Sequence, residues 1–328
     1  MKLIILANLL VVLVFLVGTI NGQSSSLPVM IFDQQPDLSI QYLEIDLYSG
    51  IVFKKVSVPN PDGSKLLKWV RAVYPYVAFF TSNNNGTLFQ IHSLNINTNV
   101  LENTYNSTTS FLYPPILSDQ PFGYFWGQTM TAYFPGLAGN GFETTSLLPY
   151  SFNTQYPSNS PIMLGPAQLN DTAQFNSIPI SAFDGVDYFY VLFSIGDLTG
   201  ISTYSLQGST SKQVILNIPG RSIQGTEQLF MLYGQLYYCV LENGVGITVS
   251  IMNLVNGEVE IIYKDLNPGY QSTFQPFVLN KITGTITILV QTPDDKILVT
   301  VLSYNQSTKQ YTIDNVIPTN SSFIIPSI

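Results

Sequence analysis

The sequence predicts an all-β fold made of repeated antiparallel sheets. The clearest unit is residues 235–265, where three β-prone runs, 236–241, 247–254 and 258–263, are joined by short glycine-containing turns. Asn-Gly turns of this kind accept the positive φ that tight hairpins need. Tyr and Phe number 20 each, and aromatic side chains favour strands over helices. A third observation, the regular spacing of similar units, specifies the architecture further.

The units repeat with a period near 50 residues. The third run of each unit closes at Leu47, Ile96, Leu148, Leu206, Leu254 and Tyr304, which lie 48 to 58 residues apart. A period of about 40–50 residues with four strands per unit is typical of β-propeller blades. The runs are continuously apolar, as sheets packed on both faces require. We expect six blades of four antiparallel strands, with seven blades or a two-sheet β-sandwich as alternatives.

Six units, each made of β-prone runs separated by turn residues, follow one another along the chain. The six units cover residues 27–58, 66–105, 111–166, 178–218, 228–263 and 274–313. The third is the least regular: runs 111–117, 124–134 and 142–148 look like strands, 135–141 like a glycine-containing loop, and the Pro/Ser/Asn-rich 151–166 like a surface excursion. This irregularity keeps the seven-blade alternative open.

The two ends of the chain predict how the ring closes. The first unit lacks its innermost strand, and an apolar run at 322–326 follows the last unit without a partner of its own. We expect 322–326 to pair beside 27–33, which closes the ring and leaves no open sheet edge between the first and last blades.

The first 22 residues predict a secretory signal peptide. Lys2 provides a minimal basic region, residues 3–17 are apolar, and Gly18 and Gly22 offer cleavage points. Residues 23–328 then form a single propeller domain that is secreted and has no membrane span. The alternatives are a membrane-tethered protein with an uncleaved signal anchor, because 18 apolar residues nearly span a bilayer, or a protein of the endolysosomal lumen.

A secreted chain can be N-glycosylated. Five Asn-x-Ser/Thr sequons without proline in the middle make the following residues candidate acceptors: Asn85, Asn106, Asn170, Asn305 and Asn320.

The composition of the chain restricts the classes of molecule that it can bind. Only 10% of residues are charged and the formal net charge is −8. Since no cluster of basic residues occurs, nucleic acid and anionic membranes are poor partners. Cys239 is the single cysteine, so an intrachain disulfide is impossible. The expected partner is an extracellular protein or a glycan, bound by a monomer.

A propeller gathers on one face the loops that join second to third strands and those that join blades. On that face we expect a candidate binding rim of acidic residues and one tryptophan: Asp37, Asp62, Glu143, Asp197, Glu242, Asp265, Asp294, Asp295 and Trp126. The rim would attract a cation or a basic partner. The alternative is that an acidic protein simply has acidic loops. No loop has the D-x-D-x-D-G spacing of a calcium site.

Few groups suited to catalysis are present. His92 is the only histidine, and strand alternation places it on one face with Gln90 and Leu94. No G-x-S-x-G nucleophile elbow occurs, and Cys239 lies between aromatic residues in a strand, where a buried inert thiol is expected. We therefore expect a non-enzymatic binding protein without a cofactor. A secreted glycosidase-like hydrolase with carboxylates at the propeller axis is the alternative.

Overall fold

The structure of the chain is a computed structural model. It describes residues 28–47, 49–60, 64–71, 76–82, 89–107, 131–138, 146–153, 162–163, 180–184, 188–195, 197–205, 211–218, 225–271, 276–280, 283–314 and 323–326. Within these ranges the regular elements are all strands, and no helix long and apolar enough to cross a membrane is present.

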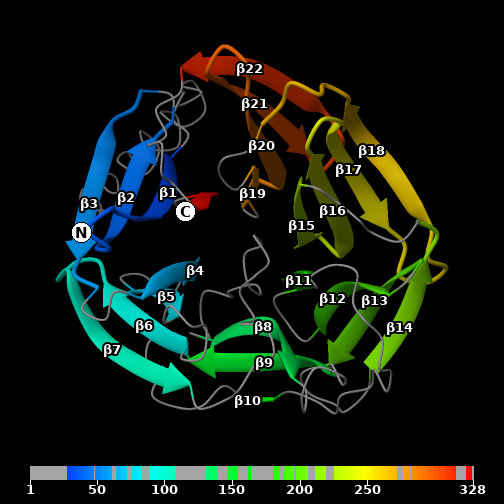
Figure 1. Cartoon of the computed structure of the whole chain (residues 1–328). Coiled ribbons are helices and arrows are strands. Elements are labelled where there is room, and N and C mark those ends of the chain that lie inside the picture. Colours follow the sequence, from blue (N-terminus) through cyan, green and yellow to red (C-terminus); the bar gives the residue numbers. More distant parts are fainter. Residues whose placement is uncertain are drawn as a thin grey trace, which may run out of the picture.

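The described strands form six antiparallel sheets around a common centre (Figure 1). The first sheet has the order β23 (Phe323–Pro326), β1 (Pro28–Gln34), β2 (Ile40–Asp46), β3 (Val52–Val58). The second contains β4 (Lys65–Arg71), β5 (Tyr76–Ser82), β6 (Phe89–Asn95) and β7 (Val100–Ser107). The third contains β10 (Ile162–Met163), β9 (Ser146–Asn153) and β8 (Thr131–Ala138).

The remaining three sheets each have four strands in sequence order. The fourth contains β11 (Ile180–Phe183), β12 (Tyr188–Ile195), β13 (Leu198–Ser205) and β14 (Ser211–Leu216). The fifth contains β15 (Gly225–Leu232), β16 (Gln235–Glu242), β17 (Gly246–Met252) and β18 (Val259–Asp265). The sixth contains β19 (Phe277–Asn280), β20 (Thr285–Gln291), β21 (Lys296–Ser303) and β22 (Thr308–Asp314).

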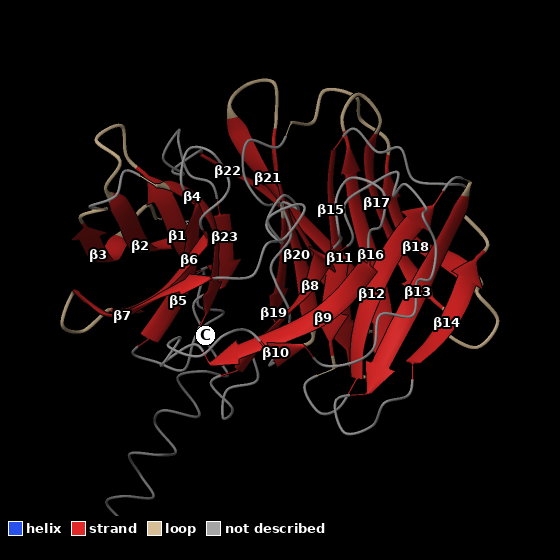
Figure 2. Cartoon of the chain, turned by 60° about the horizontal axis from the view of Figure 1, so that its bottom comes forward, coloured by secondary structure: helices blue, strands red, loops and turns tan. Residues whose placement is uncertain are grey.

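This arrangement is a β-propeller. In each four-stranded sheet one edge strand lies toward the centre and the opposite edge strand, such as β3, β7, β14, β18 or β22, lies on the circumference (Figure 1). The same radial sheets are seen from the side in Figure 2. The sequence prediction of an all-β propeller is confirmed, and the described residues form neither a seventh sheet nor a two-sheet sandwich.

The two ends of the chain meet in the first sheet. β23 pairs antiparallel with β1, with Met30 opposite Ile325 and Ile31 opposite Ile324. The predicted pairing between the C-terminal run and the first strand is therefore confirmed. The first and the last described strand of the chain thus pair with each other through their backbones.

The prediction for the third unit was partly wrong. The expected loop 135–141 begins inside β8, where Pro135 lies opposite Pro149 of β9, and the expected excursion 151–166 contains the end of β9 and all of β10. Proline and glycine disfavour strands locally, but pairing with a neighbouring strand overrides this preference. The predicted run 111–117 lies outside the described residues.

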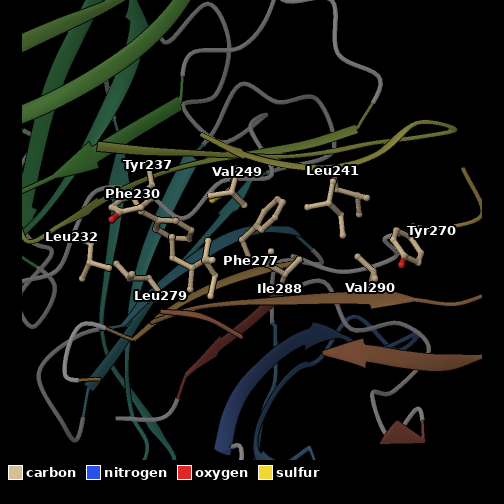
Figure 3. Packing of buried hydrophobic residues seen from close by; sticks show 14 residues of the cluster. Phe230, Leu232, Tyr237, Leu241, Val249, Tyr270, Phe277, Leu279, Ile288 and Val290 are labelled. Atoms are coloured by element: carbon tan, nitrogen blue, oxygen red, sulfur yellow. The ribbon is translucent and has the colours of Figure 1, made fainter. Parts of the chain in front are cut away.

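The first, fifth and sixth sheets are each apolar on both faces because each packs against two neighbours. In β16, Tyr237, Cys239 and Leu241 belong to a cluster shared with the sixth sheet, which Figure 3 shows from close by. Tyr238 and Val240 belong to a cluster shared with the fourth sheet. The predicted division of β16 into these two faces is confirmed.

The first sheet is buried in the same way. Val29 and Ile31 of β1 pack against the sixth sheet, and Met30 packs against the second. Fully burying an aliphatic or aromatic side chain contributes about 1.5–3 kcal/mol. The contacts between sheets therefore make a large contribution to the stability of the propeller.

A turn that joins third to fourth strands recurs in three sheets. It starts at Asp46, Asn95 or Asn253, whose carbonyl oxygen accepts a hydrogen bond from the backbone N–H four residues later, at Gly50, Asn99 or Gly257. Those last residues have φ of 69°, 61° and 77°, a region open to Gly and Asn at low cost. The second residue of each turn is an aliphatic anchor: Leu47, Ile96 or Leu254. These anchors are three of the six positions that define the period of about 50 residues. The repeated turn is therefore the physical source of that period.

Pairing between β23 and β1 predicts that the C-terminus is essential for stability. Deleting residues 321–328 removes β23 and leaves β1 with an unpaired apolar edge, so the variant should unfold at lower urea concentration or aggregate. Deleting only residues 327–328 keeps β23 and serves as the control. Urea denaturation followed by tryptophan fluorescence measures both. If the longer deletion unfolds like the full chain, the ends do not stabilise each other.

Candidate functional site

One face of the propeller gathers the loops predicted to bind. Since neighbouring strands are antiparallel, the loops from second to third strands and the links between sheets emerge on the same side. We call this side the loop face. Its described parts include residues 35–39, 197, 243–245, 266–271 and 292–295.

Six of the nine predicted rim residues are described. Asp37, Asp197, Glu242, Asp265, Asp294 and Asp295 all lie in, or at the edge of, these loops. Asp62, Glu143 and Trp126 lie outside the described residues. The six carboxylates are distributed over five loops, with Asp294 and Asp295 in the same one. No group of three or more His, Cys, Asp or Glu that could hold a metal ion occurs in the described part of the chain.

Two of the rim carboxylates hold their own turns. Asp37 Oδ1 accepts hydrogen bonds from the Ser39 hydroxyl at 2.6 Å and the Ser39 N–H at 3.0 Å. Asp294 Oδ1 accepts one from the Thr292 hydroxyl at 2.6 Å, and Lys296 Nζ lies 3.9 Å from its Oδ2. The hydroxyl bonds in particular lower the pKa of both carboxyl groups. Both therefore remain charged on the exposed surface.

Asp265 organises the link between the fifth and sixth sheets. Its Oδ2 accepts a hydrogen bond from the Tyr270 hydroxyl at 2.8 Å, and burial together with this bond raises the pKa of Tyr270 to about 12. Tyr263 on β18 accepts a hydrogen bond from Gln310 Nε2 on β22 at 2.9 Å. The Tyr263 hydroxyl in turn donates to Asp265 Oδ2 at 3.5 Å. This polar network joins the outer strands of neighbouring sheets and fixes the carboxylate at the edge of the loop face.

The loop face also carries exposed apolar side chains beside its acids. Asp37, Asp197 and Asp265 are each followed by an exposed leucine: Leu38, Leu198 and Leu266. Val245, also exposed, follows Glu242 by three residues in the β16–β17 loop. The prediction from sequence included the acids and missed their apolar neighbours, although the Asp-Leu dipeptide recurs at three loop positions.

The two side chains considered for catalysis are both buried. His92 Nε2 lies 2.9 Å from the Thr81 hydroxyl, and its ring stacks on Phe79 with centroids 4.7 Å apart. Cys239 is completely buried, which raises the pKa of its thiol and keeps it protonated. The predicted burial of Cys239 is confirmed, and both environments indicate packing roles.

Asp33 is a buried carboxylate that sequence reasoning missed. It lies at the end of β1 on the face of Val29 and Ile31 and accepts a hydrogen bond from Gln35 Nε2 at 2.7 Å. Burial raises the pKa of its carboxyl group above the usual 3.8. Strand alternation from Val29 could have indicated this position.

No protein-family model and no curated protein sequence matches the chain. Among solved structures, a DUF4784 family protein from Bacteroides caccae is similar at 11% identity and a TM-score of 0.51, over 92% of this chain and 74% of that one. A prolyl endopeptidase is similar at 12% identity and a TM-score of 0.49, over 89% of this chain and 43% of that one. The lectin of Aleuria aurantia is similar at 8% identity and a TM-score of 0.44, over 90% and 97%. These similarities concern the fold alone.

The raised pKa of Asp33 predicts how the stability of the protein changes with pH. Its pKa is higher in the folded than in the unfolded chain, so the stability linked to its proton is present below pH 3.8 and is lost as pH rises through the folded pKa. Asp33→Asn should therefore gain stability relative to the native chain between about pH 3 and 7. Urea denaturation across this range measures the difference.

Asp37→Asn is the matched control, because the pKa of Asp37 is lowered. The stability linked to its charge is present above the unfolded pKa and is lost as pH falls, so this variant should lose stability relative to the native chain as pH rises. The same slope for both variants would contradict the assignment of a raised pKa to Asp33.

Proposed function

We propose that the chain is a secreted, N-glycosylated, non-enzymatic β-propeller that binds an extracellular protein through its loop face. The apolar leader at residues 1–22 and the five sequons support secretion and glycosylation. A protein partner is favoured over a glycan by the side chains that the loop face presents.

The recurrence of an acid beside an exposed aliphatic residue is the observation that carries the proposal. Single exposed leucines are common on protein surfaces, but here one follows an acid in each of three loops of the loop face: two loops between second and third strands and one link between sheets. Apolar side chains surrounded by charge are typical of the centre and rim of protein interfaces. The complementary partner surface carries Lys or Arg around apolar residues, and the acidic rim speeds its association.

The hydrogen bonds of the loop-face carboxylates and the burial of the histidine and the thiol favour binding over catalysis. Asp37 and Asp294 accept short hydrogen bonds from their own turns, and Asp265 accepts one from Tyr270. The sole histidine and the sole thiol pack inside sheets. A rigid sheet scaffold with exposed loops is a common basis for recognition.

A binding experiment tests this proposal. The full chain is titrated with a soluble peptide of alternating Lys and Leu, and with a Glu and Leu peptide of the same length. We expect binding of the cationic peptide only, weakening as salt rises. The double variant Leu198→Ser/Leu266→Ser should bind at least about tenfold more weakly, a loss that removal of two interface side chains commonly causes.

Val255→Ser is the matched control. Val255 is 84% exposed but lies in the β17–β18 turn, on the side opposite to the loop face. This variant should bind the cationic peptide like the native chain. Equal binding of both peptides, binding only to a glycan array, or hydrolysis of a saccharide substrate would overturn the proposed protein partner.

A further inference from the structure

The β21–β22 turn departs from the turn that three other sheets share. In those sheets the residue with positive φ follows the aliphatic anchor by three positions, whereas in the sixth sheet Gln306, with φ of 63°, follows Tyr304 by two. Tyr304 replaces the anchor and is 46% exposed, while the corresponding Leu47 and Ile96 are buried. Places where a repeat breaks its own local rule are often functional.

A second tyrosine faces Tyr304 from the neighbouring sheet. The rings of Tyr233 and Tyr304 meet edge to face, with centroids 5.0 Å apart and an interplanar angle of 90°. Tyr233 is 57% exposed and has φ of 48°, a region that bulky residues rarely occupy. The sequence thus keeps an exposed aromatic residue at a turn position where Asn or Gly costs less.

Three turns hold this pair in place. The Tyr304 N–H donates to the Gly284 carbonyl oxygen at 2.8 Å. A Cβ on Gly284 would lie 2.8 Å from Tyr233 Cε2, so the absence of a side chain there makes room for the ring. The β15–β16, β19–β20 and β21–β22 turns therefore present two fixed aromatic faces on the side opposite to the loop face.

A candidate glycan acceptor adjoins the pair. Asn305 directly follows Tyr304, is exposed, and begins the sequon Asn305-Gln306-Ser307. Its Oδ1 accepts hydrogen bonds from the Ser307 hydroxyl at 2.9 Å and the Ser307 N–H at 3.3 Å. Among the described residues, its Nδ2, the atom that carries an N-linked sugar, has no hydrogen-bond partner.

We propose that Asn305 is glycosylated and that its first N-acetylglucosamine packs against the Tyr233–Tyr304 pair. The inference rests on the secretory part of the proposed function. A bond forms between Asn305 Nδ2 and C1 of the sugar, and the C1–O bond to a lipid diphosphate donor breaks. The diphosphate leaves with the electron pair, and the amide nitrogen loses one proton.

The chemistry of the turns suits a neutral sugar. The apolar C–H face of a pyranose ring fits an aromatic ring. The described residues that follow or flank the turn glycines Gly234 and Gly284 in the sequence are uncharged hydrogen-bonding groups: Gln235, Thr283 and Thr285. A sugar tethered at Asn305 is held next to the rings at high effective concentration, so even a weak contact stays formed. The attached glycan thereby covers two exposed tyrosines and stabilises the turn.

A double-mutant cycle in a secreting eukaryotic host tests the inference. A heterologous leader replaces residues 1–22, so entry into the secretory pathway does not depend on the native leader. Peptide mass mapping of the secreted chain measures occupancy at Asn305. Thermal unfolding is then compared for the native chain, Tyr304→Ala, Asn305→Gln and the double variant, after trimming each glycan to one sugar.

We expect Asn305 to be occupied and the two changes to be coupled, since an aromatic contact of this kind shifts Tm by about 2 °C in a chain of this size. Asn305→Gln should lower Tm in the chain that keeps Tyr304 and leave it unchanged in the chain that carries Tyr304→Ala. Ser307→Thr, which keeps the sequon, should behave like the native chain, and Ser307→Ala like Asn305→Gln.

An unoccupied Asn305 in the secreted chain, or equal effects of Asn305→Gln with and without the Tyr304→Ala change, would overturn the inference. These outcomes are separate from failure of the proposed function. That proposal fails if the chain with its own leader stays intact on membranes, or if the cationic peptide does not bind.

Discussion

The structure depends on packing neighbouring sheets face to face, which buries both faces of the first, fifth and sixth sheets. A single four-stranded sheet cannot do this alone, and the described packing clusters join neighbouring sheets face to face. This requirement explains why β16 carries apolar residues at successive positions, with Cys239 and Val240 both buried but against different sheets. A ring suits this requirement, since each sheet stacked about an axis has a neighbour on both of its faces. In a chain without a disulfide, this packing is the main source of stability.

Packing between the sheets leaves the loops and turns on the two sides of the propeller exposed. On the loop face, an acid followed by an exposed leucine recurs in three loops, a combination that suits a basic protein surface. On the opposite side, three turns repeat one conformation and the β21–β22 turn breaks it by exposing Tyr304 beside a sequon. The repeated turn therefore serves the fold, while the acid–leucine pairs of the loop face and the altered β21–β22 turn indicate where this chain differs from a plain scaffold.

The sequence was most informative where local chemistry and packing agree. Anchors such as Leu47 and Ile96 revealed the period because each follows a third strand and is buried by the same turn. The third unit was harder to predict because Pro135 and Pro149 favour loops locally, and their strand state depends on pairing across the sheet. The described rim acids lie on the loop face, as the predicted topology requires. Whether their carboxylates converge depends on side-chain positions, which the spacing of residues along the sequence does not determine. The Tyr233–Tyr304 contact, between residues 71 positions apart, is likewise a product of packing.

Hydrogen exchange in the intact protein tests most directly whether the two chain ends belong to one cooperative ring. Peptides that cover β1 and β23 would be compared with peptides from β19 and β20 of the neighbouring sheet. The account predicts that the amides of residues 323–326 are as strongly protected as those of residues 277–280 and exchange only with global unfolding. Rapid exchange of residues 323–326, while the other sheets stay protected, would show that the ends fray independently and would contradict a ring held by their pairing.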